Sequence, residues 1–327
     1  MIDLHLHTFY SDGASSPELL LEDAQKSGVK AIAITDHNSI KAYEHLKNID
    51  IKKYYKGKIL KGVEITCFYN GKIIELLGYG VDLEKMQSFL DEHYSVEKLV
   101  QKRQAEFDEL EARCREMGVK TNHVLADESQ SFSIPFYINN IMLFPENKRF
   151  FDDKVWGDCQ LFFRNCVCNP QSPFYIDFSK SYLSAKEAAN VIRSCGGKAV
   201  LAHAWIYRFE DTMQTIEQLY NQGCLDGIEC YYFLFSSKQQ EDLISFCQDK
   251  NLLITGGSDY HGTNRNASIG TGKGTLFVPD SLLNLRFLQK LVKEYIACLS
   301  PILQNKSLQE IDLAENQGQI KCLFQFQ

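Results

Sequence analysis

Histidines and carboxylates recur in this sequence in spacings that suit a metal site. His5 and His7 lie two residues apart, so on an extended strand both imidazoles face the same side and can bind one divalent ion together. A single His-x-His pair is common in proteins. Here Asp12, His37 and Glu64 follow in short polar motifs, Ser11-Asp12-Gly13, Thr35-Asp36-His37-Asn38 and Gly62-Val63-Glu64. Imidazole and carboxylate together are the donor set of Mn²⁺, Fe²⁺ and Zn²⁺ sites.

Predicted strands and helices alternate around these motifs. Ser16 and Pro17 predict a helix start, Leu19, Leu20 and Ala24 are expected to face inward, and Gly28 predicts the helix end. The alternation indicates βα units around a parallel sheet or barrel, whose polar site lies where the strands end. The predicted strands cover residues 2–7, 31–35, 59–65, 198–202, 227–232 and 252–255.

Two later strands end in further candidate ligands. His203 follows the predicted strand 198–202, and Asp259 and His261 follow the strand 252–255. Five of the eight histidines therefore lie at predicted strand ends, whereas His45 lies in a Lys-rich helical region. The expected convergence of these strands would place the histidines together.

The sequence resembles the PHP (polymerase and histidinol phosphatase) family of metal-dependent phosphoesterases. The resemblance rests on motifs in family order over residues 3–262: Asp3-Leu4-His5-Leu6-His7-Thr8 with Ser11-Asp12-Gly13, Thr35-Asp36-His37-Asn38, Gly62-Val63-Glu64-Ile65, Leu201-Ala202-His203 and Gly257-Ser258-Asp259-Tyr260-His261-Gly262. It implies an α/β fold, a distorted (β/α)7 barrel with a mainly helical inserted cap, and two or three divalent ions (Mn, Fe or Zn) at the barrel mouth.

The resemblance also implies which residues bind each ion. A metal-bound water would be the nucleophile, and Asp36 would orient a ligand imidazole without touching an ion. The implied ligands are His5, His7, Glu64 and Asp259 for a first ion; Glu64, Glu75 and His203 for a second; and Asp12, His37 and His261 for a third.

Two features depart from the family pattern. Glu75 stands where many relatives have a histidine ligand; it either binds the ion as a carboxylate, which favours harder ions such as Mn²⁺, or is only a polar residue on a strand. A Gly-Arg-Pro-His segment of several relatives is not evident, and residues 133–136 read Ser-Ile-Pro-Phe. Arg208 and Arg265 are the best placed alternatives for holding phosphate, although each is also compatible with a solvated surface charge.

The pattern changes between residues 83 and 182. An amphipathic stripe from Val96 to Met117 predicts one long helix that ends at Gly118, and many aromatic residues follow it. We interpret the aromatic residues as the core of a small subdomain rather than as a nucleobase-stacking surface. The predicted organisation is a discontinuous barrel over 1–82 and 183–304, a helical insertion over 83–182, and a C-terminal tail over 305–327.

Composition limits the function classes. The 327 residues are 44% hydrophobic and carry a net charge of −7, which argues against disorder and against a broad basic nucleic-acid surface. No apolar run is long enough to span a bilayer, and the N-terminus lacks a secretory pattern. The 11 cysteines are irregularly spaced, so we expect reduced thiols in a cytoplasmic protein; Cys166 and Cys168 lack a second pair for a zinc finger.

These observations lead to one main hypothesis and two others. The main one is a metal-dependent phosphomonoesterase that acts on a small phosphorylated metabolite, a nucleotide or a short oligonucleotide; within the family the insertion is most similar to that of nucleoside-bisphosphate and oligonucleotide phosphatases, and histidinol phosphate is the rival substrate. The second is an amidohydrolase-like metal hydrolase. The third is a binding module without activity. The sequence leaves the oligomeric state open.

Overall fold

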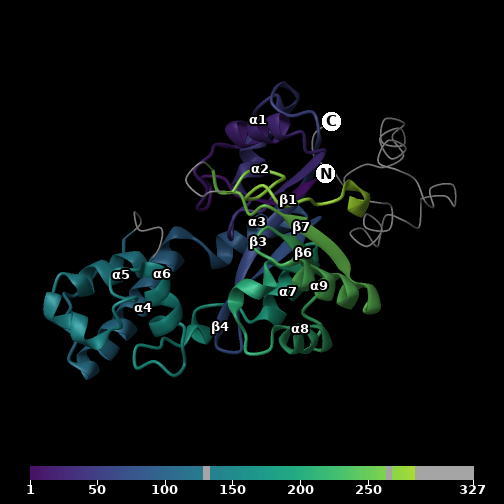
Figure 1. Cartoon of the computed structure of the whole chain (residues 1–327). Coiled ribbons are helices and arrows are strands. Elements are labelled where there is room, and N and C mark those ends of the chain that lie inside the picture. Colours follow the sequence, from purple (N-terminus) through teal and green to yellow (C-terminus); the bar gives the residue numbers. More distant parts are fainter. Residues whose placement is uncertain (128–132, 263–266, 284–327) are drawn as a thin grey trace, which may run out of the picture. The chain divides into compact units, whose positions relative to one another are not determined.

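The computed structural model describes residues 1–127, 133–262 and 267–283, and the chain divides into two compact units (Figure 1). Unit 1 consists of Met1–Cys67, Ile74–Phe89 and Ala185–Gln327, and unit 2 of Phe68–Ile73 and Leu90–Ser184. The predicted tail 305–327, and the end of the predicted barrel range beyond residue 283, lie outside the described residues.

A seven-stranded sheet forms the centre of unit 1 within the described residues. Its strands follow one another in chain order, and β1 also meets β7, because Leu6 pairs with Tyr260 and the His7 amide donates to the Tyr260 carbonyl at 2.9 Å. The sheet thus nearly closes, which confirms the predicted barrel. The strands are β1 (Asp3–Leu6), β2 (Ala31–Ile34), β3 (Lys58–Tyr69), β4 (Lys72–Tyr79), β5 (Lys198–Leu201), β6 (Gly227–Tyr232) and β7 (Leu253–Gly257).

One strand runs against the parallel direction that the βα pattern predicts. β4 pairs with β5 in antiparallel register, whereas β1–β2–β3 and β5–β6–β7 pair in parallel. The reason is local: Asn70 and Gly71 both have positive φ, 46° and 78°, as a two-residue type I′ hairpin turn requires. The Asn-Gly dipeptide is the sequence signal for this reversal.

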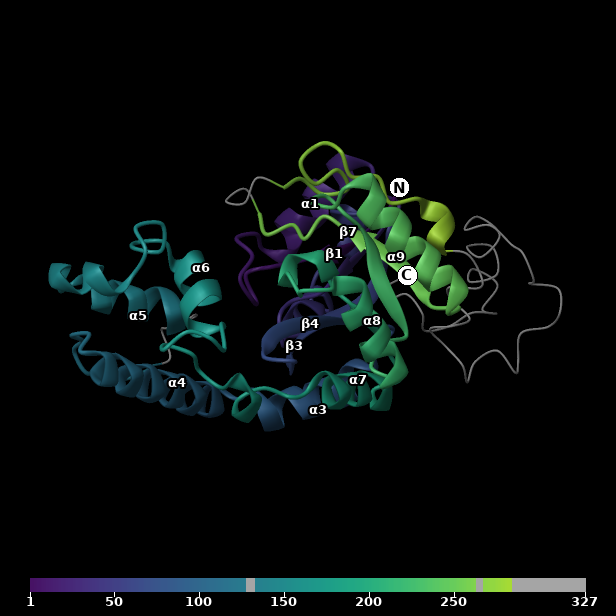
Figure 2. The same ribbon diagram turned by 60° about the horizontal axis from the view of Figure 1, so that its bottom comes forward.

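Helices pack on the sheet of unit 1. α7 contacts β5, and α9 lies along β6 and β7 (Figure 2). Buried strand residues such as Leu4, Leu60 and Val200 form a hydrophobic core of the sheet. The helices of this part of the chain are α1 (Pro17–Ser27), α2 (Lys41–Leu46), α3 (Leu83–His93), α7 (Ala185–Ser194), α8 (Thr212–Asn221) and α9 (Ser237–Asp249).

Helix α1 shows how far local signals reach. Ser16 caps its start by accepting from the Leu19 amide, and Gly28 ends it in the left-handed conformation, both as predicted. The prediction that Leu19 faces inward is wrong: its side chain is 54% exposed, whereas Leu20, Leu21 and Ala24 are buried. Leu19 precedes this buried stripe by one residue, which on a helix turns its side chain about 100° away.

Unit 2 is mainly helical, with α4 (Val96–Met117), α5 (Ser133–Met142) and α6 (Cys159–Phe162). Gly118 ends α4 in the left-handed conformation, as expected. The aromatic residues of this unit gather in its core, where Phe107, Tyr137, Phe162 and Phe178 are buried and others pack around them. This arrangement agrees with the core interpretation of the aromatic stretch.

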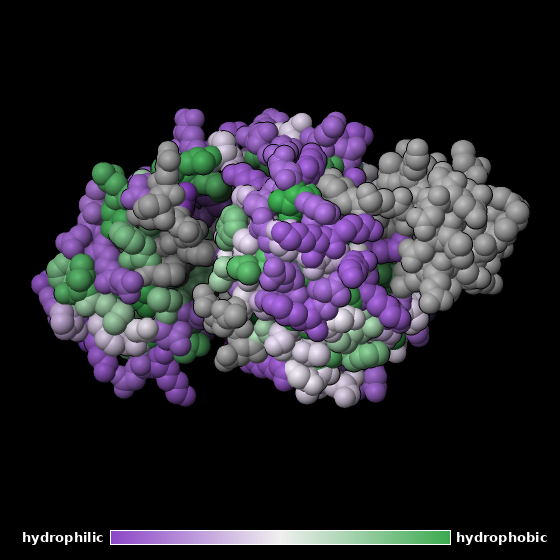
Figure 3. Space-filling model, turned by 90° about the horizontal axis from the view of Figure 1, so that it is seen from above, coloured by the Kyte–Doolittle hydropathy of each residue, from purple (hydrophilic) through white to green (hydrophobic). Residues whose placement is uncertain are grey.

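Hydrophilic side chains predominate on the face shown in Figure 3, with hydrophobic ones interspersed between them. Within the described part of the chain, no helix combines the length and the apolar character needed to cross a membrane.

The nine cysteines of that part are all free thiols, and most are buried. Cys166 and Cys168 belong to unit 2, where Cys166 packs in the core and Cys168 against it.

Candidate metal centre

Backbone hydrogen bonds hold the strand ends of unit 1 in register. The Thr35 amide donates to the Leu6 carbonyl at 2.8 Å, the Glu64 amide to the Asp36 carbonyl at 3.2 Å, and the Ala202 amide to the Glu75 carbonyl at 3.1 Å. These bonds tie the segments that carry the predicted ligands to their neighbours. Hydrogen bonds between neighbouring main-chain segments therefore bring the predicted ligands close together.

Gly257, at the end of β7, allows two of these segments to meet. A Cβ atom on Gly257 would lie 2.4 Å from the Cβ of His5 and 2.5 Å from its backbone nitrogen. Such distances are impossible, so any side chain here would push β7 away from β1. Only glycine permits the close approach that brings Asp259 and His261 to the histidines of β1.

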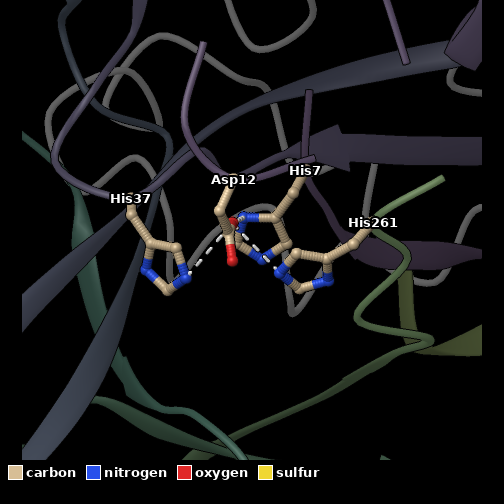
Figure 4. Close-up of side chains that lie close together, drawn as sticks. All are labelled: His7, Asp12, His37 and His261. Atoms are coloured by element: carbon tan, nitrogen blue, oxygen red, sulfur yellow. Dashed lines mark ion pairs between the residues drawn. The ribbon is translucent and has the colours of Figure 1, made fainter. Parts of the chain in front are cut away.

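Asp12 lies among three imidazoles (Figure 4). Its Oδ1 is 3.1 Å from His261 Nε2, 3.7 Å from His37 Nε2 and 3.8 Å from His7 Nδ1. The four side chains offer ligand atoms that all lie within 4.8 Å of one another. Ring nitrogen Nδ1 of His261 is 2.8 Å from the Asp259 carbonyl, which can only accept, so neutral His261 keeps a lone pair on Nε2.

A second group surrounds Glu64 and Asp259. His5, His7 and Glu64 also place ligand atoms within 4.8 Å of one another. Asp259 Oδ1 is 3.5 Å from His5 Nε2 and 3.2 Å from His7 Nε2. These are the four residues predicted for the first ion, and the structure brings them together.

Glu64 also belongs to a third group, which it forms with His37 and Glu75. His203 Nε2 is 3.4 Å from Glu64 Oε1 and 3.4 Å from Glu75 Oε2. His37 Nδ1 joins them at 3.3 Å from Glu64 and 3.6 Å from Glu75. The carboxylate of Glu75 thus points at two imidazoles, as a ligand would, and His37 and His7 lie between neighbouring groups.

Burial and neighbouring charges lower the pKa of one histidine of the cluster and raise the pKa of another. Burial, with the rings of His261 and His37, lowers the pKa of His7 to about 3, although the Asp259 carboxylate acts the other way. Burial disfavours charged His203, but its contacts with Glu64 and Glu75 raise its pKa to about 9. Partial burial and the Glu64 charge raise the pKa of Glu75. Carboxylates forced together in this way require compensating cations.

The hydrogen-bond accounting fits divalent ions. Among the described residues, several buried polar atoms that lack a hydrogen bond of acceptable geometry belong to this cluster, while others lie elsewhere, such as the Tyr137 hydroxyl in unit 2. Each such atom costs about 1–3 kcal/mol in a protein interior. Metal ions would take up one nitrogen of each neutral ring and the carboxylate oxygens, which are their preferred donors, whereas the other ring nitrogen carries a proton. The atoms of the cluster that lack such a bond include both ring nitrogens of His7, Nδ1 of His37, Nε2 of His261, Nδ1 of His203 and Oε1 of Glu64.

Two buried carboxylates of this region were missing from the sequence prediction. Glu229, on β6, contacts His5 Nδ1 at 3.0 Å and accepts from the His203 amide at 2.8 Å. Asp3 accepts from the amides of Ser258 at 2.9 Å and Gly270 at 2.6 Å, and burial raises its pKa to about 6 against the effect of these bonds. The available signal was an acidic residue inside an otherwise apolar predicted strand.

Asp36 has a different contact set from the one expected. Its oxygens accept from the Thr8 amide at 2.7 Å, the Thr8 hydroxyl at 2.6 Å and the Ser11 hydroxyl at 2.7 Å. Asp36 therefore holds the loop that carries Asp12, whereas Glu229 makes the imidazole contact that we expected of Asp36. The reason is the turn after β1, which brings Thr8 and Ser11 over the carboxylate.

Of the two arginines predicted to hold phosphate, the structure describes only Arg208. Arg208 directly follows the 3-10 turn Ala204–Tyr207, is exposed, and adopts a left-handed backbone with φ of 51°. Arg265 lies outside the described residues. The nine predicted ligands thus form one cluster in unit 1, while their assignment to ions stays a prediction.

Comparison with known proteins addresses the family. Residues 3–130 match the family model of the PHP domain. The PHP match includes the motifs of His5, His7, Asp12, His37, Glu64 and Glu75 and ends before His203, Asp259 and His261. A search of curated proteins gave no match.

Solved structures extend the likeness in fold beyond the PHP match. A candidate metal-dependent phosphoesterase from Bifidobacterium adolescentis aligns with a TM-score of 0.60 at 22% identity, covering 90% of this chain and 97% of its own. An amidohydrolase from Chromobacterium violaceum, solved with bound sulfate and no metal, aligns with a TM-score of 0.56 at 22% identity, covering 80% of this chain and 87% of its own. At this identity the two structures support the fold over the parts of the chain that they cover.

Proposed function

We propose that this protein is a metal-dependent phosphomonoesterase. The observation that carries the proposal is the cluster of five imidazoles and four carboxylates in unit 1, with buried ring nitrogens that lack hydrogen bonds among the described residues. Polar atoms left unsatisfied in a protein interior are costly unless a ligand takes them up. The PHP match over residues 3–130 supports the same assignment.

The donor set suits two or three ions of Mn, Fe or Zn. Ions bound there would lower the pKa of water and neutralise charge that develops on phosphate oxygens. The protein's own part is to hold the donors: Asp12 with His37 and His261, Glu64 and Asp259 with His5 and His7, and Glu64 and Glu75 with His203. The extra carboxylate at Glu75 favours harder ions such as Mn²⁺.

Small phosphorylated compounds are the proposed substrates. A nucleoside bisphosphate or a short 5′-phosphorylated oligonucleotide is the first choice, because the insertion resembles that of phosphatases acting on them, and histidinol phosphate is the second. We further propose that Arg208 contacts the phosphate, since it directly follows the turn after His203. A guanidinium presents two parallel donors to a phosphate.

The test is phosphate release from a panel of these substrates by protein loaded separately with Mn²⁺, Fe²⁺ and Zn²⁺. 4-Nitrophenyl phosphate and bis(4-nitrophenyl) phosphate separate monoester from diester cleavage. We expect monoester turnover that a chelator abolishes and metal restores. If the fully loaded protein releases no phosphate from any member of the panel, the proposal is wrong.

Amide and lactone hydrolysis is the competing activity. A carboxylate–imidazole metal site can activate water against either electrophile, and a protein of similar fold is an amidohydrolase. Ring-opening and deacylation assays under the same metal loading decide between the two. Turnover of amides or lactones without phosphate release would support this second candidate and refute the first.

A further inference from the structure

Glu229 is a fully buried carboxylate whose two oxygens have separate partners. Its Oε1 is 3.0 Å from His5 Nδ1, and its Oε2 accepts a hydrogen bond from the His203 amide at 2.8 Å. His5 lies on β1 and His203 follows β5, so this one side chain on β6 contacts two segments that each carry a predicted ligand.

The first contact selects the tautomer of His5. A carboxylate only accepts, so the His5 ring donates from Nδ1 to Glu229. In the neutral ring the lone pair then resides on Nε2, which faces Glu64 Oε2 at 3.2 Å and Asp259 Oδ1 at 3.5 Å. Nε2 is thus the nitrogen that can bind an ion beside these carboxylates.

The second contact holds an unfavourable backbone. His203 has φ of 23° and ψ of 53°, a region that non-glycine residues rarely adopt. The hydrogen bond from its amide to Glu229 fixes this turn, from which the His203 ring reaches Glu64 and Glu75. A residue in such a conformation persists only when its surroundings stabilise it.

We propose that Glu229 is a positioning residue that sets the tautomer of His5 and the backbone of His203 at once, and so couples the two ions that these histidines would bind. The inference rests on the proposed metal-dependent function. It concerns a residue outside the nine predicted ligands, each of whose two oxygens faces an N–H donor.

The contacts of Glu229 with His5 and with the His203 amide require two acceptor oxygens. Glutamine has the same shape but only one such oxygen, so Glu229→Gln tests the proposal. In Glu229→Gln only one oxygen remains, and the amide group must face either His5 or the His203 N–H. Facing His5, it donates to Nδ1 and moves the ring proton to Nε2, which blocks the ligand atom. Facing His203, it sets two N–H groups against each other. Either result should weaken metal binding about 10- to 100-fold, the usual effect of losing such a supporting bond.

The experiment is a calorimetric titration of the metal-free full chain with Mn²⁺, for wild type, Glu229→Gln and Glu106→Gln. Glu106 is the matched control, since it is also buried but belongs to unit 2. We expect about 10- to 100-fold weaker Mn²⁺ binding in Glu229→Gln, and wild-type affinity in Glu106→Gln. In Zn²⁺-loaded wild type, nitrogen NMR of the imidazoles should show His5 protonated at Nδ1.

Three outcomes would overturn the inference. Equal Mn²⁺ affinity in Glu229→Gln and wild type, with or without a loss of thermal stability, would leave Glu229 a merely structural residue. A His5 ring protonated at Nε2 in the loaded wild type would contradict the tautomer argument. A wild-type chain that binds no divalent ion would refute the proposed function itself, which the other two outcomes leave standing.

A second variant covers the case in which Glu229→Gln does not fold. Glu229→Asp keeps both acceptor oxygens but is one methylene shorter, so it reaches one donor well and the other poorly. We expect its Mn²⁺ affinity to be about 10-fold below that of wild type, the smallest loss expected for this position. Affinity equal to wild type would count against the positioning role.

Discussion

Asn147 in unit 2 and His7 in unit 1 are both fully buried polar side chains, but they differ in their hydrogen bonds. In unit 2, Asn147 is fully buried, accepts from the Lys120 amide at 2.9 Å and donates to the carbonyls of Lys120 and Ile141 at 2.7 and 2.9 Å. In unit 1, His7 is equally buried, and neither ring nitrogen makes a hydrogen bond of acceptable geometry within the described residues.

The difference in hydrogen bonding separates polar side chains that stabilise the fold from polar side chains that are expected to bind a ligand. A buried amide with every donor and acceptor satisfied stabilises the fold around it. A buried imidazole that lacks hydrogen bonds costs free energy in the metal-free chain, so it persists where a ligand offsets that cost. Hydrogen-bond accounting therefore points to the metal centre when it is combined with residue type, because here the atoms without hydrogen bonds belong to imidazoles and carboxylates that lie together.

The largest effect is expected from removing His5 and His7 together. The variant His5→Ala/His7→Ala should lose the first proposed ion and at least about 1000-fold in phosphate release, since metal ions supply several kcal/mol of charge stabilisation. Metal analysis and turnover measure both losses. His123→Ala is the control, because His123 is 61% exposed and pairs with Glu111 in unit 2. Wild-type turnover in the double variant would refute the site.

The opposite pattern is expected from Asn147→Ala. Removing this side chain leaves the Lys120 amide and two carbonyls without their buried partner, which should lower the free energy of unfolding by about 3 kcal/mol. Chemical denaturation of unit 2 measures this loss. Metal content and affinity should equal those of wild type; a loss of metal in this variant would break the distinction between the two units.

Metal binding itself should stabilise unit 1 alone. Mn²⁺ at 100 times its dissociation constant raises the free energy of unfolding by about 2.7 kcal/mol when only the folded state binds it. Hydrogen exchange of the loaded and metal-free chain should show added protection around β1, β3 and β5 and none in α4 and α5. Equal protection of α4 would show that unit 2 also responds to the metal.

Much of the site was predictable because its signals are local. His5, His7, His37, His203 and His261 stand at or beside the ends of short β-branched or apolar runs, and parallel strands bring such ends together. The same reasoning located six of the seven strands by position and direction. It did not identify β4 or its antiparallel direction, although Asn70-Gly71 carries the hairpin signal, because the βα pattern indicates parallel strands only.

The rest depends on contacts between distant parts of the sequence. Glu229 is 224 residues from His5, and its role follows only once β6 is known to lie beside β5. Asp36 shows the converse: its place next to His37 suggested an imidazole contact, but the turn after β1 gave it Thr8 and Ser11 instead. Supporting residues of this kind are set by tertiary packing, which a motif does not contain.

The smallest effect is expected from Leu19→Ala, and Leu20 is its direct comparison, because the two residues are identical in type and adjacent on α1. Leu19 is 54% exposed and Leu20 fully buried. Leu19→Ala should change the free energy of unfolding by less than about 0.5 kcal/mol, whereas Leu20→Ala should cost about 2–5 kcal/mol. Thermal and denaturant unfolding of the two variants measure the difference. Equal losses would mean that Leu19 is also buried in solution. The helix face that carries Leu19 would then be covered rather than exposed to solvent.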